Sequence, residues 1–274
     1  MNNSNLTKDY LTLTQFSKIV GVTIETLRHY ERKGLFQPEK IINTRRFYCP
    51  TQISTFKMIS VFKDIGIPLD AIKEYVTHRS PENIMRLFTK QKSVVTDRIR
   101  YYNEAHTVIS TYLELITEGM CAIENELTVV EMTDRAIVLG EIVDANESFS
   151  IHSIFMKFRE THNDMSLNVS YPIGGYFDTM DDFRNRPEKP MRFFSINPKG
   201  EDIREGGLYL VGYTRGYYEH INNLSAQMSE FAEDHGLLFS GPVFNTYLFN
   251  EVSINDRDNY LLQVSAAVKE KQGL

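Results

Sequence analysis

Apolar residues near the start of the chain recur at steps of three and four, which is the spacing of one face of a helix. Phe16, Ile19 and Val20 predict a first short helix, with Thr14 as its N-cap. Gly21 can adopt the positive φ that ends a helix. This stretch therefore predicts a short helix that stops at a tight turn.

A second helix is predicted directly after that turn. Thr23 is placed to cap it, Glu25 lies in its first turn, and Ile24 and Leu27 face the first helix. Two short helices joined in this way predict a helix-turn-helix, which presents its second helix to DNA. The pattern alone leaves that function open, because paired amphipathic helices around a glycine also occur in other all-α proteins.

The following segments extend this unit. Residues 43–48 are basic and aromatic, and they predict a hairpin-like wing that lies against a DNA backbone. Pro50 suits the first turn of a third helix, and Pro68 opens a fourth helix after Gly66. The residues of these two helices that are predicted to point inward are Ile53, Phe56, Ile59 and Phe62, then Leu69, Ile72 and Val76.

The polar and aromatic side chains on the outer faces of this unit can reach phosphates and base edges. The predicted DNA-contacting residues are Thr14, Lys18, Thr23, Thr26, Arg28, His29, Tyr30, Arg45, Arg46 and Tyr48. Charge supports this reading, because residues 1–80 hold 12 Lys+Arg against 7 Asp+Glu although the whole chain has a net charge of -6. A basic first quarter on an acidic remainder is typical of a DNA-binding head on a body that does not bind DNA, although chance asymmetry would look the same.

A long helix is predicted next, because no glycine or proline occurs between Ile84 and Gly119. Its apolar or semi-apolar residues alternate steps of three and four, as in a coiled-coil seam. That seam comprises Ile84, Phe88, Gln91, Val95, Arg98 or Ile99, Tyr102, Ala105, Ile109, Tyr112 and Ile116. Such a helix is about 50 Å long, so its stripe requires a partner. We expect a homodimer through residues 82–118, although a bundle helix within one chain would show the same stripe.

After Cys121 the helical rhythm stops, and two runs of strand, helix, strand, strand follow one another. The predicted strands are 136–143, 171–177, 191–196, 208–214, 243–249 and 260–268, and the predicted helices are 150–160 and 218–235. Two such runs predict a duplicated α+β domain with a cleft where the halves meet. The fold class is thus multidomain α and α+β, with a winged helix-turn-helix at 11–80, a coiled-coil helix at 82–118 and a duplicated strand-helix-strand-strand domain at 122–274.

Composition narrows the class of protein. The 274 residues are 42% hydrophobic, which suffices for two cores, and no stretch is long and apolar enough for a signal peptide or a membrane span. We therefore expect a cytoplasmic protein with no membrane partner. The two cysteines, Cys49 and Cys121, lie too far apart to form a ligand spacing, and no zinc, nucleophile or cofactor motif is present. We expect no metal, no cofactor and reduced thiols.

The first part of the chain resembles the MerR family of transcription activators. The residues that establish the resemblance are Leu27-Arg28-His29-Tyr30-Glu31 with Gly34-Leu35, then Arg46-Phe47-Tyr48, then Gly66-Ile67-Pro68-Leu69 with Ile72. The resemblance covers about residues 11 to 77. It departs at His29, where a tyrosine is usual, and at Gln52, where an aspartate often begins the third helix. The family's fold implies an antiparallel two-helix coil between protomers.

The last part resembles the gyrase-inhibitor-like effector domain of multidrug-responsive, BmrR-type regulators of that family. The resemblance rests on the duplicated layout and on residues 241–247, GPVFNTY, followed by Tyr260. In that family an acidic residue after Gly-Pro meets cationic drugs, and Asn245 stands there in this chain. The predicted effector-binding residues are Tyr171, Tyr176, Phe177, Phe244, Asn245, Tyr247 and Tyr260, with Tyr217 and Tyr218 as further candidates. Most strand aromatics fill cores, so each remains a candidate.

These expectations combine into one function. A dimeric regulator would bind a palindromic promoter element and sense a small lipophilic or aromatic effector. The resemblance implies that the effector favours a form that distorts the DNA for RNA polymerase. The resemblance also implies that Cys121 lies near the thiolates of metal-sensing relatives, but one cysteine is too few for such a site. Two other classes remain. One is a DNA-binding head fused to a small-molecule hydrolase, with Glu251 or Asp258 as a base, and the other is an architectural protein that bends DNA without a ligand.

Overall fold

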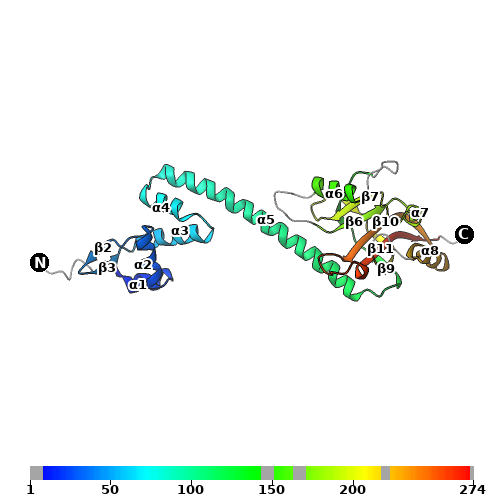
Figure 1. Cartoon of the computed structure of the whole chain (residues 1–274), viewed down its shortest axis with the longest axis horizontal. Helices are drawn as coiled ribbons and strands as arrows, with labels where there is room; N and C mark the ends of the chain where they lie inside the picture. Colours follow the sequence, from blue (N-terminus) through cyan, green and yellow to red (C-terminus); the bar gives the residue numbers. More distant parts are fainter. Residues whose placement is uncertain (1–8, 143–150, 163–170, 217–222, 272–274) are drawn as a thin grey trace. The chain divides into compact units, whose positions relative to one another are not determined.

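The computed structural model describes residues 9–142, 151–162, 171–216 and 223–271. The chain divides into two compact units, Met1–Ile99 and Arg100–Leu274. The division falls inside the helix α5 (Pro81–Cys121), so this helix contributes to both units (Figure 1). The long helix predicted over 82–118 is present as α5. Its coiled-coil pairing and the division into three domains stay predictions.

The two predicted helices of the helix-turn-helix are α1 (Leu13–Val20) and α2 (Ile24–Lys33). Gly21 ends α1 with a φ of 77°, as predicted, which is a conformation that suits glycine because it has no Cβ. The Thr23 hydroxyl accepts a hydrogen bond from the Thr26 amide and caps α2. The turn between the helices is therefore built as the sequence predicts.

The predicted cap of α1 is wrong by two residues. Thr12, not Thr14, is the N-cap, because its hydroxyl accepts a hydrogen bond from the Gln15 amide and its own amide donates to the Gln15 side chain. This reciprocal pair is a capping box, which satisfies two helix-start donors together. Thr14 lies in the first turn of α1 and is exposed.

The predicted wing is the hairpin of β2 (Lys40–Ile42) and β3 (Arg45–Tyr48). Its turn residues, Asn43 and Thr44, have φ angles of 46° and 67°. Positive φ at both central positions is the backbone of a tight hairpin turn, which asparagine tolerates better than a β-branched threonine. A further short strand, β1 (Leu11–Thr12), pairs with β3 to give the strand order β1-β3-β2.

The third and fourth helices are α3 (Gln52–Asp64) and α4 (Leu69–Thr77). Four of the residues that were predicted to point inward are fully buried, namely Phe56, Ile59, Phe62 and Ile72. Leu69 was also predicted to point inward, but 42% of it is exposed. It is the first residue of α4 and lies outside the core cluster of this unit.

Aromatic rings fill the centre of the amino-terminal unit. The ring centroids of Phe16 and Tyr48 lie 4.5 Å apart, and those of Tyr30 and Phe56 lie 5.6 Å apart. Tyr30 and Tyr48 are 5% and 1% exposed, so the predicted exposure of both side chains is wrong. The reason for Tyr30 is helical geometry, because it lies three residues after the buried Leu27 and therefore on the same face.

An eight-stranded sheet forms the carboxy-terminal unit. Its strands are β4 (Leu127–Met132), β5 (Arg135–Leu139), β6 (Ile173–Phe177), β7 (Arg192–Ile196), β8 (Asp202–Arg204), β9 (Gly207–Arg215), β10 (Leu237–Phe249) and β11 (Leu261–Glu270). They are ordered β4-β9-β11-β10-β6-β7-β5-β8. The same unit also contains the helices α6 (Ile151–His162), α7 (Met180–Asn185) and α8 (Leu224–Asp234) and the short 3-10 helix η2 (Arg257–Asn259).

The two ends of this sheet lie close together. Residues 133–134 join β4 at one end to β5 near the other, and residues 205–206 join β8 at the far edge to β9. The two connections also bond to each other, because the Gly206 amide donates to the Asp134 carboxylate at 2.7 Å. Connections of two residues cannot span an open eight-stranded sheet, so the sheet curves strongly.

The curvature gives the sheet an inner and an outer face. The inner face is lined by Ile137, Phe194, Tyr209, Val211, Phe244 and Leu261, and Leu115 of α5 packs into it. The outer face is lined by Phe177, Leu210, Val243, Tyr247, Leu262 and Val264, and α7 and α8 cover it. Gly119 of α5 approaches β10 so closely that a Cβ there would lie 2.7 Å from the Phe249 ring. The second half of α5 is therefore packed on its own unit.

The six predicted strands are present. Three of their ends, at residues 177, 196 and 249, are as predicted, and the other boundaries shift by one to six residues. The predicted helix 150–160 is α6, and the predicted helix 218–235 is described from residue 223 onward as α8. In each run the first strand pairs with the third and the third with the second, giving β9-β11-β10 and β5-β7-β6. The duplication itself stays a prediction. The strands β4 and β8 and the helix α7 were not predicted.

Candidate nucleic-acid interface

The recognition helix α2 presents a polar surface beside the turn that positions it. Arg28 and His29 are exposed, as are Thr23 at its start and Lys18 on α1. Thr26 is half-buried, and its hydroxyl shares a 2.9 Å hydrogen bond with that of Thr23. The buried positions Leu27 and Tyr30 hold the opposite side of the helix in the core. The exposed side can therefore face a ligand without disturbing the packing.

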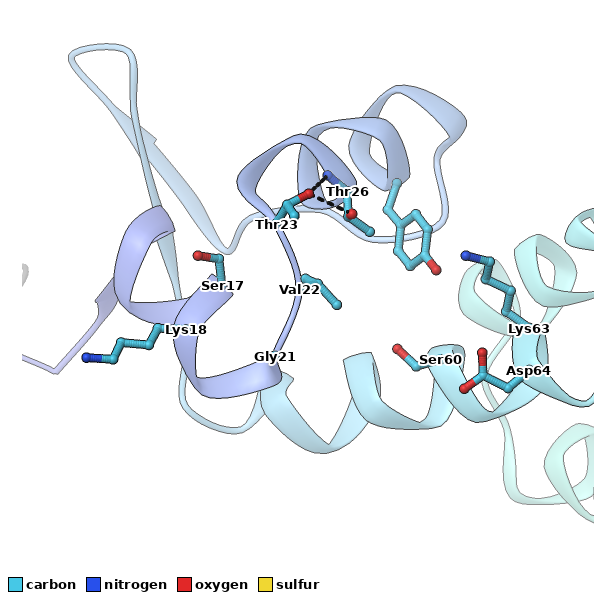
Figure 2. Close-up of a pocket in the computed structure, with 10 residues that line it drawn as sticks. Ser17, Lys18, Gly21, Val22, Thr23, Thr26, Ser60, Lys63 and Asp64 are labelled. Carbon is cyan, nitrogen blue, oxygen red and sulfur yellow. Dashed lines mark hydrogen bonds between the residues drawn. The ribbon is translucent and has the colours of Figure 1, made fainter.

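A pocket of about 580 Å³ adjoins this surface, between the helix-turn-helix and α3 (Figure 2). Its lining residues come from α1, the turn, α2 and α3, and they are Ser17, Lys18, Gly21, Val22, Thr23, Thr26, Tyr30, Ser60, Lys63 and Asp64. Figure 2 shows Ser60, Lys63 and Asp64 of α3 on one side, with Thr23 and Thr26 at the start of α2 on the other. Four of the predicted DNA-contacting residues thus lie around one hollow.

The pocket suits a phosphate at its rim. It includes the amino end of α2, where backbone amides and the helix dipole favour an anion. Lys18 and Lys63 add two positive charges, and Asp64 adds one negative charge. The Lys63 ammonium also lies 5.8 Å from the centre of the Tyr30 ring. Tyr30 is therefore a buried support for Lys63 rather than an exposed contact.

Ser60 and Lys63 were not among the predicted contacts. Lys63 lies in the last turn of α3, where a lysine is also expected simply to complement the helix dipole. Only the packing of α3 beside the helix-turn-helix brings it into the same pocket as Lys18 and Thr23. The one signal in the sequence is its position just before the 66–69 segment on which the family resemblance rests.

The wing presents one free-standing and one paired arginine. Arg45 is exposed at the start of β3. Arg46 instead donates to the Glu31 carboxylate of α2 at 2.6 Å, and this hydrogen bond raises the pKa of the Arg46 guanidinium above its ordinary value. The pair ties the wing to the recognition helix. Tyr48, the last residue of β3, has a buried side chain, so it anchors the wing to the core of the unit.

The predicted effector-binding residues are divided between the two faces of the sheet. Tyr176 and Phe244 pack edge to face on the inner side, with ring centroids 5.4 Å apart. Tyr247 and Tyr260 pack edge to face on the outer side, at 5.8 Å, in the same cluster as Phe177. Alternate residues of a strand point to opposite faces, so this set does not line a single cleft. Tyr217 and Tyr218 lie outside the described residues.

Asn245 is completely buried in the sheet. Its side-chain oxygen accepts a hydrogen bond from the Gly175 amide at 2.5 Å and so joins β10 to β6. Its side-chain nitrogen has no hydrogen-bond partner within the part of the chain that the structure describes. A carboxylate at this position would be buried in the sheet, which is costly without a cationic partner.

A buried carboxylate does occur elsewhere in this unit, on α5. Glu104 is 5% exposed, accepts a hydrogen bond from the Tyr171 hydroxyl at 2.6 Å and pairs with Lys199. Burial and the bond to Glu104 raise the pKa of the Tyr171 phenol. Tyr171, which was predicted to bind an effector, is thus a contact between the sheet and α5. Glu251 and Asp258, the candidate bases, are both exposed.

The geometry defines a winged helix-turn-helix DNA-binding unit followed by a helix and a sheet-rich unit. Residues 11–79 match the MerR HTH family regulatory protein family. The multidrug-efflux transporter 2 regulator of Bacillus subtilis (strain 168) is 27% identical over 272 residues, 96% of this chain and 98% of that protein. The amino-terminal unit is a MerR-family helix-turn-helix domain, and the likeness to a transcriptional regulator extends over nearly the whole chain.

Two other regulators are similar to shorter parts of this chain. The multidrug-efflux transporter 1 regulator of the same organism is 25% identical over 105 residues, which are 38% of this chain and 37% of that protein. The transcriptional regulator BrlR of Pseudomonas aeruginosa is 38% identical over 64 residues, 23% of this chain and 24% of that protein. All three relatives named here are regulators by name, and one of them is named a transcriptional regulator.

Two general features of the described residues complete this picture. None of their helices is long and apolar enough to cross a membrane. Within the same residues, no group of three or more His, Cys, Asp or Glu side chains is arranged to hold a metal ion.

Proposed function

We propose that this protein is a ligand-responsive transcriptional regulator that binds a palindromic promoter element as a dimer. The observation that supports this most is the MerR-family head, in which Arg28 and His29 are exposed beside a pocket that contains Lys18 and Lys63. The helix can enter a major groove while the lysines and Arg45 meet flanking phosphates.

The dimer is proposed to form through α5, over residues 82–118. The second half of this helix is buried along one side, at Glu104, Val108, Thr111, Leu115 and Gly119. A second side of the helix, which includes predicted seam residues, stays exposed. The exposed large apolar residues of α5 are Met85, Phe88, Val94, Ile99, Tyr101, Tyr102, Ile109, Leu113 and Met120. An exposed apolar stripe of this length requires a partner, and a second copy of α5 is the simplest one. The family resemblance favours an antiparallel pair.

The three-part organisation follows from that role. The head, residues 11–80, would read DNA, the helix at 82–118 would pair, and residues 122–274 would bind an effector as two related halves. In this arrangement the effector domain acts through α5, because Glu104, Leu115 and Gly119 of that helix all pack on the sheet unit.

The proposed mechanism is a change in the shape of the DNA. An effector that binds one conformer of the dimer more tightly than the other would shift the population towards it. That conformer would bend and underwind the promoter so that its boxes align for RNA polymerase. We place this protein among multidrug-responsive regulators, with a small lipophilic or aromatic effector. Asn245 supplies no charge for a cation, so a neutral or amphipathic effector fits better.

The test is a selection of binding sequences from random duplex DNA with the full-length chain. A regulator of this kind enriches a two-fold symmetric sequence and binds it with a steep salt dependence. Binding is then compared for Lys63→Ala and for Lys57→Ala, an exposed lysine on the same helix but away from the pocket. The proposal predicts weaker binding for the first variant only. Selection of no symmetric sequence would refute it.

A further inference from the structure

Two arginines face each other on the inner side of the sheet. Arg204 at the end of β8 pairs directly with Arg135 at the start of β5. Residues directly opposite in an antiparallel pair have side chains on the same face. That face is the inner one, because Ile137, two residues after Arg135, is buried in the inner cluster. Like charges directly opposite repel, so this placement requires compensation.

The nearby acids have other hydrogen-bond or ion-pair partners, and Asp202, on the same face of β8 as Arg204, accepts a hydrogen bond from the Leu139 amide at 2.8 Å. Arg135 donates to the Glu114 carboxylate of α5 at 2.9 Å. Glu118, one helical turn further, accepts a hydrogen bond from the side chain of Gln263. Among the described residues, Arg204 makes no ion pair, and its shielded Nε has no hydrogen-bond partner. Glu118 acts on Arg204 through its charge alone, so Arg204 is a partly buried cation without an ion-pair partner among the described residues.

The surroundings of Arg204 hold its guanidinium in place rather than neutralise it. Its Cζ lies 5.7 Å from the centre of the Tyr209 ring, and Tyr209 is fixed because its hydroxyl donates to the Glu205 carbonyl at 2.7 Å. Burial, followed by the charge of Arg135, lowers the pKa of Arg204 below its ordinary value. An arginine nevertheless stays protonated in proteins, so the charge remains.

Such an arrangement matches an anion in shape and charge. A guanidinium presents parallel N–H donors that a carboxylate or a phosphate accepts in a bidentate pair. An anion would give the Nε a partner and offset the repulsion from Arg135. Among the described residues no side chain forms an ion pair with Arg204, whereas a ligand can.

We propose that Arg204, supported by Arg135 and Tyr209, binds the carboxylate or phosphate group of a small ligand on the inner face of the sheet. The proposal deepens the proposed function, because it rests on this unit being the effector-binding part, and of the neutral and amphipathic effectors proposed above it selects an amphipathic anion. The site also adjoins α5 through Glu114, so an anion bound there lies next to the proposed dimer helix.

The probes are benzoate, inorganic phosphate and the neutral benzamide, each added to the full-length chain at constant ionic strength while the melting temperature is followed. Benzoate or phosphate should raise the Tm of the wild type, and benzamide should not. A response to benzoate alone identifies a carboxylate ligand, and a response to phosphate alone identifies a phosphate ligand. No response to either anion would overturn the proposal.

The informative variant is Arg204→Met, which keeps the stem over Tyr209 and removes the charge. Without ligand it should melt at a higher temperature than the wild type, because an unpaired buried charge is lost, and it should no longer respond to the anion. The exposed Arg186→Met is the matched control and should respond like the wild type. An Arg204→Met chain that responds normally contradicts the proposal, as does one that is less stable without ligand.

Arg204→Lys gives a second measurement, since it keeps the charge but loses the planar fork. Its Kd for the responding anion should be at least about tenfold weaker than that of the wild type by calorimetry, because bidentate contacts are lost. An unchanged Kd would show that charge alone acts. All of these readouts are independent of DNA. If the chain binds the anion but selects no symmetric DNA sequence, the proposed function fails and the anion site stands.

Discussion

The two units of this protein place their candidate residues in opposite environments. In the amino-terminal unit, Lys18, Arg28 and His29 are exposed on helices whose inner faces form the core. In the carboxy-terminal unit, Phe177, Asn245 and Tyr260 are themselves part of the packed interior. In a helix, the 3.6-residue period is enough to predict from the sequence which residues are exposed to DNA and which are buried in the core. A ligand site in a sheet requires knowing which face each residue takes and what covers it.

The largest effect should come from a charge on the exposed stripe of α5. Ile109 is 60% exposed in the single chain, so Ile109→Glu should be harmless if the stripe has no partner. If two copies of α5 pair there, the variant buries an unpaired charge, which costs about 3–5 kcal/mol. Sedimentation equilibrium should then show monomers at micromolar concentration. Asn103→Glu, at an exposed polar position of the same helix, is the control and should remain dimeric.

A smaller effect is expected where α5 joins the sheet unit. Glu104→Gln keeps the shape of the side chain but removes the charge that Lys199 and Tyr171 engage. Leaving buried partners poorly satisfied costs about 1–3 kcal/mol, so the free energy of unfolding should fall by that amount in urea. Glu114→Gln, whose carboxylate is 65% exposed, should change it by less than about 1 kcal/mol. Equal losses for the two variants would contradict the account.

The same contact predicts a dependence on alkaline pH. The pKa of Tyr171 is raised in the folded protein, so between the unfolded value of about 10 and the folded value only the unfolded chain loses this proton. The contribution of Tyr171 to stability is therefore complete below pH 10 and is lost as the pH rises above it. Urea unfolding from pH 8 to 11 should show a shallower decline for Tyr171→Phe than for the wild type. Identical slopes would remove Tyr171 from this role.

In the head, Lys63→Ala should weaken DNA binding and reduce the slope of log K against log salt by about 0.9 if the lysine neutralises one phosphate. Lys57→Ala provides the comparison on the same helix. A salt slope that is unchanged in the Lys63 variant would exclude a phosphate contact at the pocket and confine DNA recognition to α2 and the wing.

The smallest effect concerns the pair that joins the wing to α2. Arg46→Ala should weaken DNA binding, and it should make the salt slope shallower by about one unit only if Arg46 also contacts a phosphate. If Arg46 only holds the wing against α2, Glu31→Gln should weaken DNA binding to a similar extent without changing the salt slope. The coupling energy from a double-mutant cycle should be about 1 kcal/mol or less, because Arg46 is 31% exposed.

Local rules predicted most of the head. The cap at Thr23, the turn at Gly21 and the inward positions Phe56, Ile59 and Phe62 depend on residues within a few positions of each other. The error at Thr14 arose because a capping box needs a reciprocal partner, which Gln15 offers to Thr12. The error at Tyr30 was avoidable, since its spacing from Leu27 already placed it on the buried face.

The sheet unit was less predictable because its site depends on long-range placement. The strands themselves follow from local patterns. Arg204 and Arg135 become neighbours only because β8 pairs with β5, which lies about 70 residues earlier in the chain. Glu104 meets Tyr171 through a contact 67 residues apart in sequence. Neither pairing leaves a local signal in a single sequence.

The central claim is that two copies of this chain read one symmetric DNA element, and the stoichiometry of the complex tests it most directly. The full-length protein is mixed with the duplex obtained by selection, and the mass of the complex is measured by sedimentation. The account predicts two chains on each duplex, and a duplex carrying one half-site should be bound far more weakly. One chain per duplex, with full affinity for a single half-site, would contradict it.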